Sequence, residues 1–149
     1  MKCIAPLILL LIGSASCSKE RHITRQTLKR QEAVMALAKK IFGHYSQHTD
    51  LTSDNLDTLG FISDAEFGLL RDKLKCSDVE VVHVGGPTFN VPVDSLVIFT
   101  RSGFPLKQYN IMVDVRQNPR DSVPMPVDAN RHYRIAVGIY YFESELSIS

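Results

Sequence analysis

Two histidines and a nearby aspartate are the side chains in this sequence best placed to bind a metal ion. His44 and His48 are four residues apart, a spacing that puts both imidazoles on one face of a helix, and Asp50 follows closely. Two imidazoles and a carboxylate are a suitable ligand set for zinc. The HExxH motif is absent, and a histidine at a helix C-terminus also complements the helix dipole. The pattern therefore leaves a zinc site and a solvated helix end as alternatives.

Cys76 and His83 are a second pair whose residue types suggest chemistry, that of a nucleophile and a base. The residues around them do not match a local signature of a cysteine hydrolase. We expect Cys76 to be a buried or half-buried thiol at the end of a helix. We therefore predict no catalytic residues and no cofactor, and the sequence favours a protein that is not an enzyme.

The N-terminus has the pattern of an export signal that ends at a cysteine. Lys2 is followed by a short apolar run over residues 4–12 and by small residues at 13–16. This order is typical of a secretory signal peptide, and the run is too short to span a bilayer. Ser14-Ala15-Ser16-Cys17 then resembles a bacterial lipobox, which predicts cleavage after Ser16 and lipidation of Cys17. Ordinary cleavage is the alternative, and it would leave Cys17 free to form a disulfide with Cys76.

The expected location is the cell envelope. Ser18-Lys19 lacks the aspartate associated with retention at the inner membrane, so a lipidated chain is expected to be an outer-membrane lipoprotein. Without lipidation, we expect a periplasmic protein. In either case export and a balanced total charge of +1 argue against a nucleic-acid partner.

Charge is distributed unevenly along the chain. Residues 18–48 carry seven Lys and Arg against two Glu, a net charge of +5, whereas residues 49–149 have a net charge of −5. A basic segment directly after a membrane anchor can lie near anionic headgroups. A solvated helix face is the other interpretation of the same residues.

The pattern of apolar residues predicts helices first. Residues 20–48 contain no proline and have apolar residues at a 3–4 spacing from Leu28 onward, which predicts one long helix. Before Leu28 the residues are mostly charged, so we expect residues 17–27 to be a lipid-anchored or flexible basic tether and residues 28–149 to be one domain. Ser63 and Glu66 form a capping-box pattern that begins a second helix over about 64–74.

The periodicity changes to that of strands after Cys76. Residues 79–84, 96–100, 109–115 and 131–142 read as four strands, and the connections are too short for helical crossovers. The sequence therefore predicts an α+β domain, with the long helix and one or two short helices on a four-stranded antiparallel sheet. On the last strand Tyr140 and Tyr141 must point to opposite faces. One of them is therefore expected on the surface, as an interface residue or as a ring partly covering the core.

The order of a long helix, a connecting turn and a small antiparallel sheet resembles the globular part of type IV pilin-like proteins, in particular the major pseudopilins of type II secretion systems. The resemblance rests on Ala36-Leu37-Ala38 through Tyr45, on Leu56-Asp57-Thr58-Leu59, and on residues 82–86 with 95–100. It implies a fold of that kind. The short apolar segment with Pro6 and the lipobox-like site differ from a prepilin segment, so no functional residue is carried over.

Together these features predict an exported, lipid-anchored bacterial envelope protein. The expected role is a non-enzymatic binding or accessory component in surface assembly or secretion, held to the membrane by its anchor and binding another envelope protein. The alternative is a small exported enzyme or ligand-binding domain with a helix–sheet pocket, in which a metal would be held by His44, His48 and Asp50.

Overall fold

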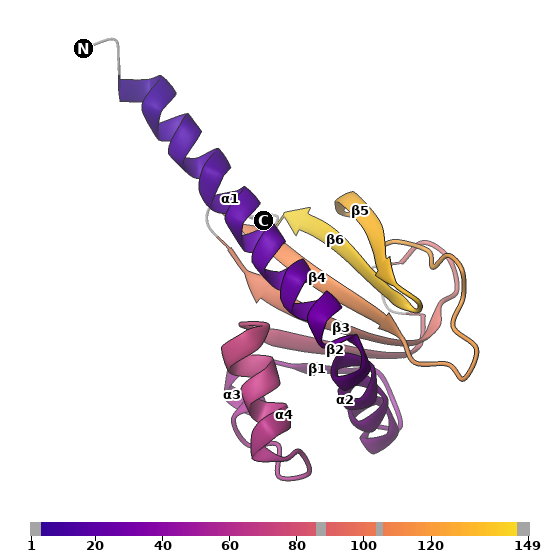
Figure 1. Ribbon diagram of the computed structural model, residues 1–149. Coiled ribbons are helices and arrows are strands. Elements are labelled where there is room, and N and C mark those ends of the chain that lie inside the picture. The colour runs from indigo at the N-terminus through magenta and orange to yellow at the C-terminus, as the bar shows by residue number, and fades with distance from the viewer. Residues whose placement is uncertain (1–3, 86–88, 104–105, 146–149) are drawn as a thin grey trace.

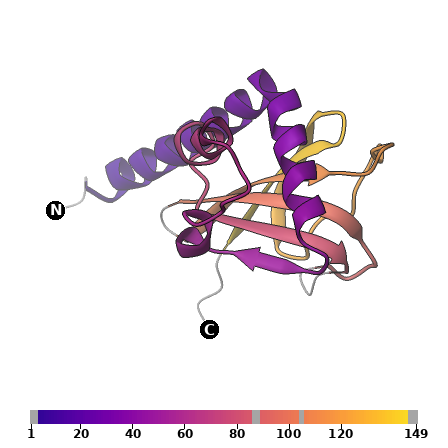
Figure 2. The same cartoon turned by 90° about the horizontal axis from the view of Figure 1, so that it is seen from below.

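The computed structural model describes residues 4–85, 89–103 and 106–145, with side chains described from Cys17 onward. Within these ranges an antiparallel sheet of six strands lies beneath helices that cover one of its faces (Figures 1 and 2). The elements, in chain order, are α1 (Ile4–Lys29), α2 (Gln31–His44), β1 (Thr49–Leu51), α3 (Ser53–Leu56), α4 (Asp64–Gly68), the π-helical turn η1 (Leu69–Lys73), β2 (Asp78–Val84), β3 (Asp94–Ser102), β4 (Lys107–Asp114), β5 (Ala129–Ala136) and β6 (Ile139–Glu145).

The strands are arranged in the order β1-β2-β3-β4-β6-β5, and every neighbouring pair is antiparallel. One row across the sheet pairs Val79 with Phe99, Phe99 with Ile111, and Ile111 with Tyr141. These four side chains point to the helix-covered face, because directly opposed residues share a face. The sheet thereby presents a continuous apolar surface to the helices.

The main core lies between that surface and the helices. The buried residues of α2 are Val34, Leu37, Ala38 and Ile41, at the 3–4 spacing of an amphipathic helix. In the structure α2 contacts β2 and β3, while α1 contacts β4 and β5. The two helices therefore divide the sheet between them.

A second apolar cluster covers part of the opposite face. Val82, Leu96, Ile98, Met112, Tyr140 and Phe142 from the strands are joined there by Phe89, Val93 and Val123 from connecting loops. Strand β4 is therefore covered on both faces, and Tyr109 through Asp114 are all buried. This two-sided burial explains why the apolar residues Ile111, Met112 and Val113 are consecutive in β4 and do not alternate with polar ones.

The α+β class and the antiparallel sheet are confirmed, but the number of strands was predicted wrongly. The described residues form two more strands than the four expected. Strand β1 has only three residues, two of them the polar Thr49 and Asp50, so the sequence reads as a turn. The single strand expected over residues 131–142 is the hairpin β5–β6, which turns at Gly138 with a φ of 71°. Because two residues form the turn, the apolar alternation continues through it unchanged.

The long helix expected over residues 20–48 is also wrong, because two helices occupy that segment. Arg30 has a φ of −126°, outside the helical range, and the chain bends there between α1 and α2 (Figure 2). No glycine or proline marks the bend. The capping box at Ser63 is confirmed: its hydroxyl accepts from the Glu66 backbone N–H at 3.2 Å, and its own N–H donates to the Glu66 carboxylate at 2.7 Å.

The packed part of the chain begins earlier than the expected boundary at residue 28. Ile23 and Thr27 are fully buried on the sheet side of α1, and Glu20 is 7% exposed. The side chain of Leu28, by contrast, is exposed. Residues 20–27 are therefore part of the folded domain rather than a tether, because Arg21 and Arg25 occupy the outward side of a helix whose other side is packed.

Candidate functional site

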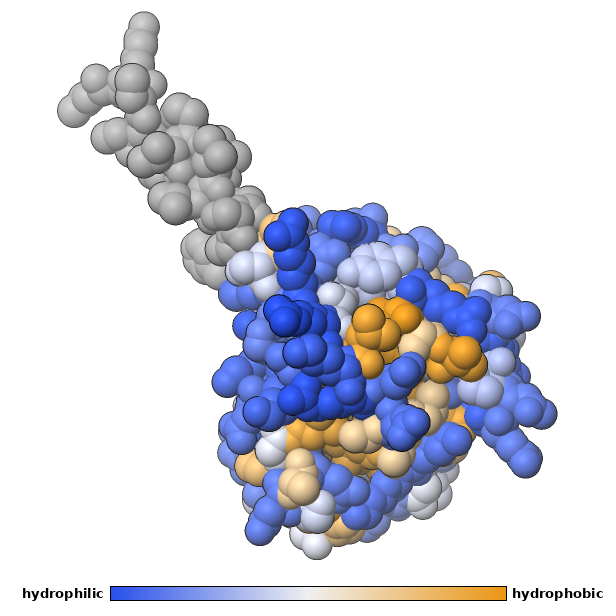
Figure 3. All heavy atoms as spheres, viewed as in Figure 1, coloured by the Kyte–Doolittle hydropathy of each residue, from blue (hydrophilic) through white to orange (hydrophobic). Residues whose placement is uncertain are grey.

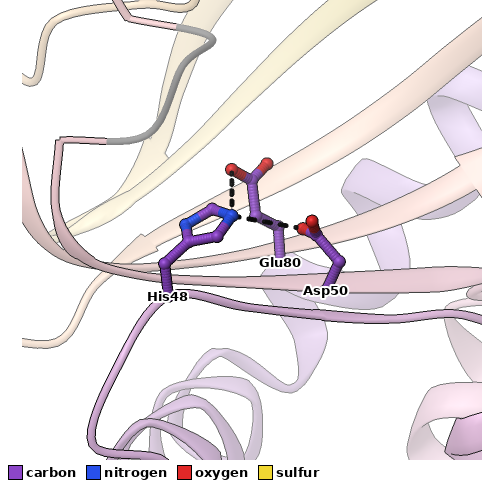
Figure 4. A group of neighbouring side chains, drawn as sticks. All are labelled: His48, Asp50 and Glu80. Carbon is purple, nitrogen blue, oxygen red and sulfur yellow. Dashed lines mark ion pairs between the residues drawn. The ribbon is translucent and has the colours of Figure 1, made fainter.

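Three potential metal ligands meet at the β1 edge of the sheet: His48, Asp50 and Glu80 (Figure 4). The His48 Nε2 atom lies 3.5 Å from an Asp50 carboxylate oxygen and 3.8 Å from a Glu80 carboxylate oxygen. The three donor atoms all lie within 4.8 Å of one another. Both carboxylates point away from the helices, toward the face of the sheet that the helices leave open.

The pairing of β1 with β2 creates this group. Asp50 and Glu80 are directly opposed across the two strands, and Glu80 is opposed in turn by Ile98 on β3. His48 immediately precedes β1 and reaches the same side. Because one row of the sheet sets the position of both carboxylates, their separation depends on strand register and not on a loop conformation.

The surroundings of Glu80 disfavour the negative charge of its ionised carboxylate. Burial raises the pKa of Glu80 above its usual value, the negative charges of Asp50 and Asp128 raise it further, and His48 acts in the opposite direction. The Glu80 side chain is only 22% exposed, whereas that of Asp50 is 71% exposed. The His48 Nδ1 atom is buried without a hydrogen-bond partner among the described residues. The site is therefore rich in acceptor oxygens and poor in donors.

A small polar cavity adjoins the group on the same face. Thr100 donates to the Asn110 side-chain oxygen at 2.8 Å, Asn110 donates to Ser144 at 3.2 Å, and Ser144 donates to Gln108 at 3.2 Å. This network lines a cavity of about 70 Å³ together with Glu80 and other residues. Such a volume accepts a few water molecules and no larger ligand.

The structure brings together only two of the three predicted metal ligands. His48 and Asp50 are neighbours, but His44 ends α2 and stacks on Phe61 with ring centroids 3.8 Å apart. The helix stops before His48, so the four-residue spacing no longer places the two imidazoles on one face. Glu80 was not expected among the ligands. The sequence predicted the strand over residues 79–84 that contains Glu80. It did not predict that this strand pairs with the residues around Asp50.

Cys76 and His83 do not form a reactive pair. Cys76 is 3% exposed, and burial raises the pKa of its thiol to about 12, so the thiol stays protonated at neutral pH. The His83 ring stacks on Phe42 with centroids 4.0 Å apart. Cys17 is exposed, and both it and Cys76 are free thiols.

Tyr140 and Tyr141 lie on opposite faces of the sheet, as the strand period requires. The expectation that one of them is on the surface is wrong, because Tyr140 is 4% exposed and Tyr141 is fully buried. Tyr141 belongs to the helix-side core and Tyr140 to the second cluster. The loops that cover the second face therefore bury the Tyr140 ring, which the strand pattern alone would place on the surface.

The outward side of α1 is basic. Arg21, Arg25 and Lys29 are spaced four residues apart and are all exposed, while Ile23 and Thr27 face the sheet. Exposed Cys17 precedes this stripe on the same helix. In the described residues no helix combines the length and the apolar character needed to cross a membrane.

Comparison with protein-family models, with curated proteins and with solved structures finds no match to this chain.

Proposed function

We propose that this chain is exported and held at the membrane of a bacterial envelope by a lipid on Cys17, where its folded domain binds another envelope protein. The role is that of a non-enzymatic accessory component in surface assembly or secretion. The observation that carries this proposal is the position of Cys17, which is exposed and lies three residues before Glu20, where the packed domain begins.

The course of α1 supports removal of the first 16 residues. The N-terminal part of α1 extends beyond the edge of the sheet (Figure 1). The buried residues that fasten α1 to the sheet, Glu20, Ile23 and Thr27, all follow Cys17. Cleavage before Cys17 therefore leaves every one of these contacts in the mature chain.

The basic stripe of α1 supports a position close to the membrane surface. A lipid on Cys17 would hold Arg21, Arg25 and Lys29 about one, two and three helical turns from the anchored residue. Each basic residue near an anionic surface contributes about 1 kcal/mol to binding. The stripe would therefore add electrostatic attraction to the hydrophobic anchoring by the lipid.

Apolar grooves beside α2 offer a surface for the protein partner. One groove of about 560 Å³ separates α2 from α4 and includes Ala33, Ala36 and Leu69. A second, of about 540 Å³, separates α2 from the β5–β6 turn and includes Met35 and Val137. Apolar residues gather on this face amid hydrophilic ones (Figure 3). An apolar centre with a polar rim is the usual composition of a protein interface.

Intact mass of the protein from the membrane fraction of a bacterial host tests the anchor. We expect the mass of a chain that begins at Cys17 and carries acyl groups, and we expect Cys17→Ser to lack them and leave the membrane fraction. Cys3→Ser is the matched control, because the predicted cleavage removes that cysteine. An unmodified chain in the soluble fraction, or a Cys17→Ser variant that behaves as the parent protein, would refute anchoring at this residue.

A further inference from the structure

The opposed carboxylates of Asp50 and Glu80 have less positive charge near them than is needed to balance their two negative charges. Like charges directly across a strand pair destabilise a sheet, and these two are opposed in the β1–β2 register. Within the described residues His48 is the only ion-pair partner of either carboxylate. Asp128 adds a further negative charge that acts on Glu80. A bound cation would remove this repulsion.

The distances fit a metal ion with short bonds. Zinc binds nitrogen and oxygen ligands at about 2.0–2.2 Å, so two ligands of a tetrahedral site lie roughly 3.3–3.6 Å apart. The His48 Nε2 atom is 3.5 Å from Asp50 and 3.8 Å from Glu80. Small side-chain rotations are enough to bring the three atoms onto one ion. Strand pairing holds two of the ligands in place before any metal arrives.

The ligand types select the class of metal. An imidazole nitrogen with two carboxylates suits a divalent ion such as Zn²⁺, and the absence of sulfur among the three ligands disfavours Cu(I). A neutral imidazole that binds through Nε2 carries its proton on Nδ1, and no described residue donates a hydrogen bond to the Nδ1 atom of His48, so nothing there excludes this tautomer. Three protein ligands leave at least one position for water or for a donor atom from a partner.

We propose that His48, Asp50 and Glu80 form a binding site for a divalent transition-metal ion, with Zn²⁺ as its best-fitting occupant. The site lies on the face of the sheet opposite the helices and not in a helix–sheet pocket. It does not depend on lipidation of Cys17, so failure of either proposal leaves the other standing.

Zinc titration of the full chain carrying Cys3→Ser and Cys17→Ser tests the site, since these substitutions remove both N-terminal thiols as competing ligands. Competition with a chromophoric chelator gives the stoichiometry and the Kd. We expect one Zn²⁺ per chain and a Kd at least about ten-fold weaker in each of His48→Ala, Asp50→Asn and Glu80→Gln, because each loses a ligand. Zinc should also raise the Tm of the parent chain but not of these variants.

His44→Ala is the matched control, because His44 is four residues from His48 but stacks on Phe61 instead of facing the site. Its Zn²⁺ affinity should equal that of the parent. Circular dichroism without metal establishes that each variant is folded, and Glu80→Gln preserves the shape of the side chain. Absence of stoichiometric binding, or binding that survives both His48→Ala and Glu80→Gln, would overturn the proposal.

Discussion

Asp114 is a charged residue with no exposed side-chain surface, and two arginines compensate its charge. The Arg120 backbone N–H and Nε each donate to one carboxylate oxygen at 2.8 Å, and the Arg116 backbone N–H donates to the other at 3.2 Å. Burial alone would raise the pKa of Asp114, but these hydrogen bonds lower it by more. Arg120 also donates to the Asp94 carbonyl at 2.7 Å, so one side chain ties the loop after β4 to the start of β3.

Replacing this carboxylate should destabilise the fold. We expect Asp114→Asn to lower the free energy of unfolding by about 2–4 kcal/mol, because the arginine donors lose their charged acceptor while remaining partly exposed. Urea denaturation at pH 7 measures the difference. Asp121→Asn, in the exposed part of the same loop, should change stability by less than about 0.5 kcal/mol.

Comparison of the parent protein with Asp114→Asn also tests how the free energy of unfolding depends on pH. A carboxyl group whose pKa is lowered in the folded state stabilises the protein above its unfolded pKa, which is about 3.9 for aspartate. That contribution is lost as the pH falls through the lower, folded pKa. The stability difference between the parent and Asp114→Asn should therefore be constant at neutral pH and shrink in acid. A difference that grows in acid would contradict the assigned direction.

At the scale of elements, α1 is fastened to the β5–β6 hairpin by one buried carboxylate. Glu20 accepts from Arg131 at 2.8 Å and from the Tyr133 hydroxyl at 2.9 Å. Burial raises the pKa of Tyr133 to about 12, and the hydrogen bond to Glu20 and its negative charge contribute to the increase. The Tyr133 ring lies beside Tyr141 with centroids 4.9 Å apart, which continues the contact into the core.

A double-mutant cycle with Glu20→Ala and Tyr133→Phe measures the interaction energy between these two side chains. We expect a coupling energy of about 1–2 kcal/mol, because the hydrogen bond has a charged acceptor and is partly buried. The surface pair Lys40–Glu66, at 2.7 Å, is the control and should couple by less than about 1 kcal/mol. Additive effects of the Glu20 and Tyr133 substitutions would show that their hydrogen bond does not help to hold α1.

At the scale of the whole molecule, the packing of the helices on the sheet leaves Cys76 inaccessible. Its thiol belongs to the helix-side core, and the Arg71 side chain donates to its backbone carbonyl at 3.0 Å. The high pKa of the buried thiol further reduces its reactivity. Reaction at Cys76 therefore requires the core to open.

Alkylation followed by peptide mass spectrometry reports that opening. In unlipidated protein we expect exposed Cys17 to react freely and Cys76 to react at least about a thousand-fold more slowly, since opening the core costs most of the folding free energy. With increasing denaturant, Cys76 labelling should follow the loss of circular dichroism. Comparable rates at the two cysteines in native protein would show that the core around η1 opens on its own.

Local patterns in the sequence were sufficient for the α+β class, for the capping box at Ser63, and for strands near β2, β3 and β4. Each depends on the spacing of neighbouring residues, which reflects backbone geometry within one element. The candidate site could be predicted only in part, because local patterns report only on residues that are close in the chain. His48 and Asp50 are close in the chain, so their types and spacing drew attention to them.

Tertiary contacts decided the remaining features. The bend at Arg30 has no breaker residue and arises where α1 and α2 pack on different strands. Strand β1, too short and polar to be recognised, exists because β2 offers it a pairing edge, and that pairing adds Glu80 to the site. Burial of Tyr140 depends on loops that return across the second face. In each case the partner is distant in sequence, and no local pattern records which distant segment will supply the contact.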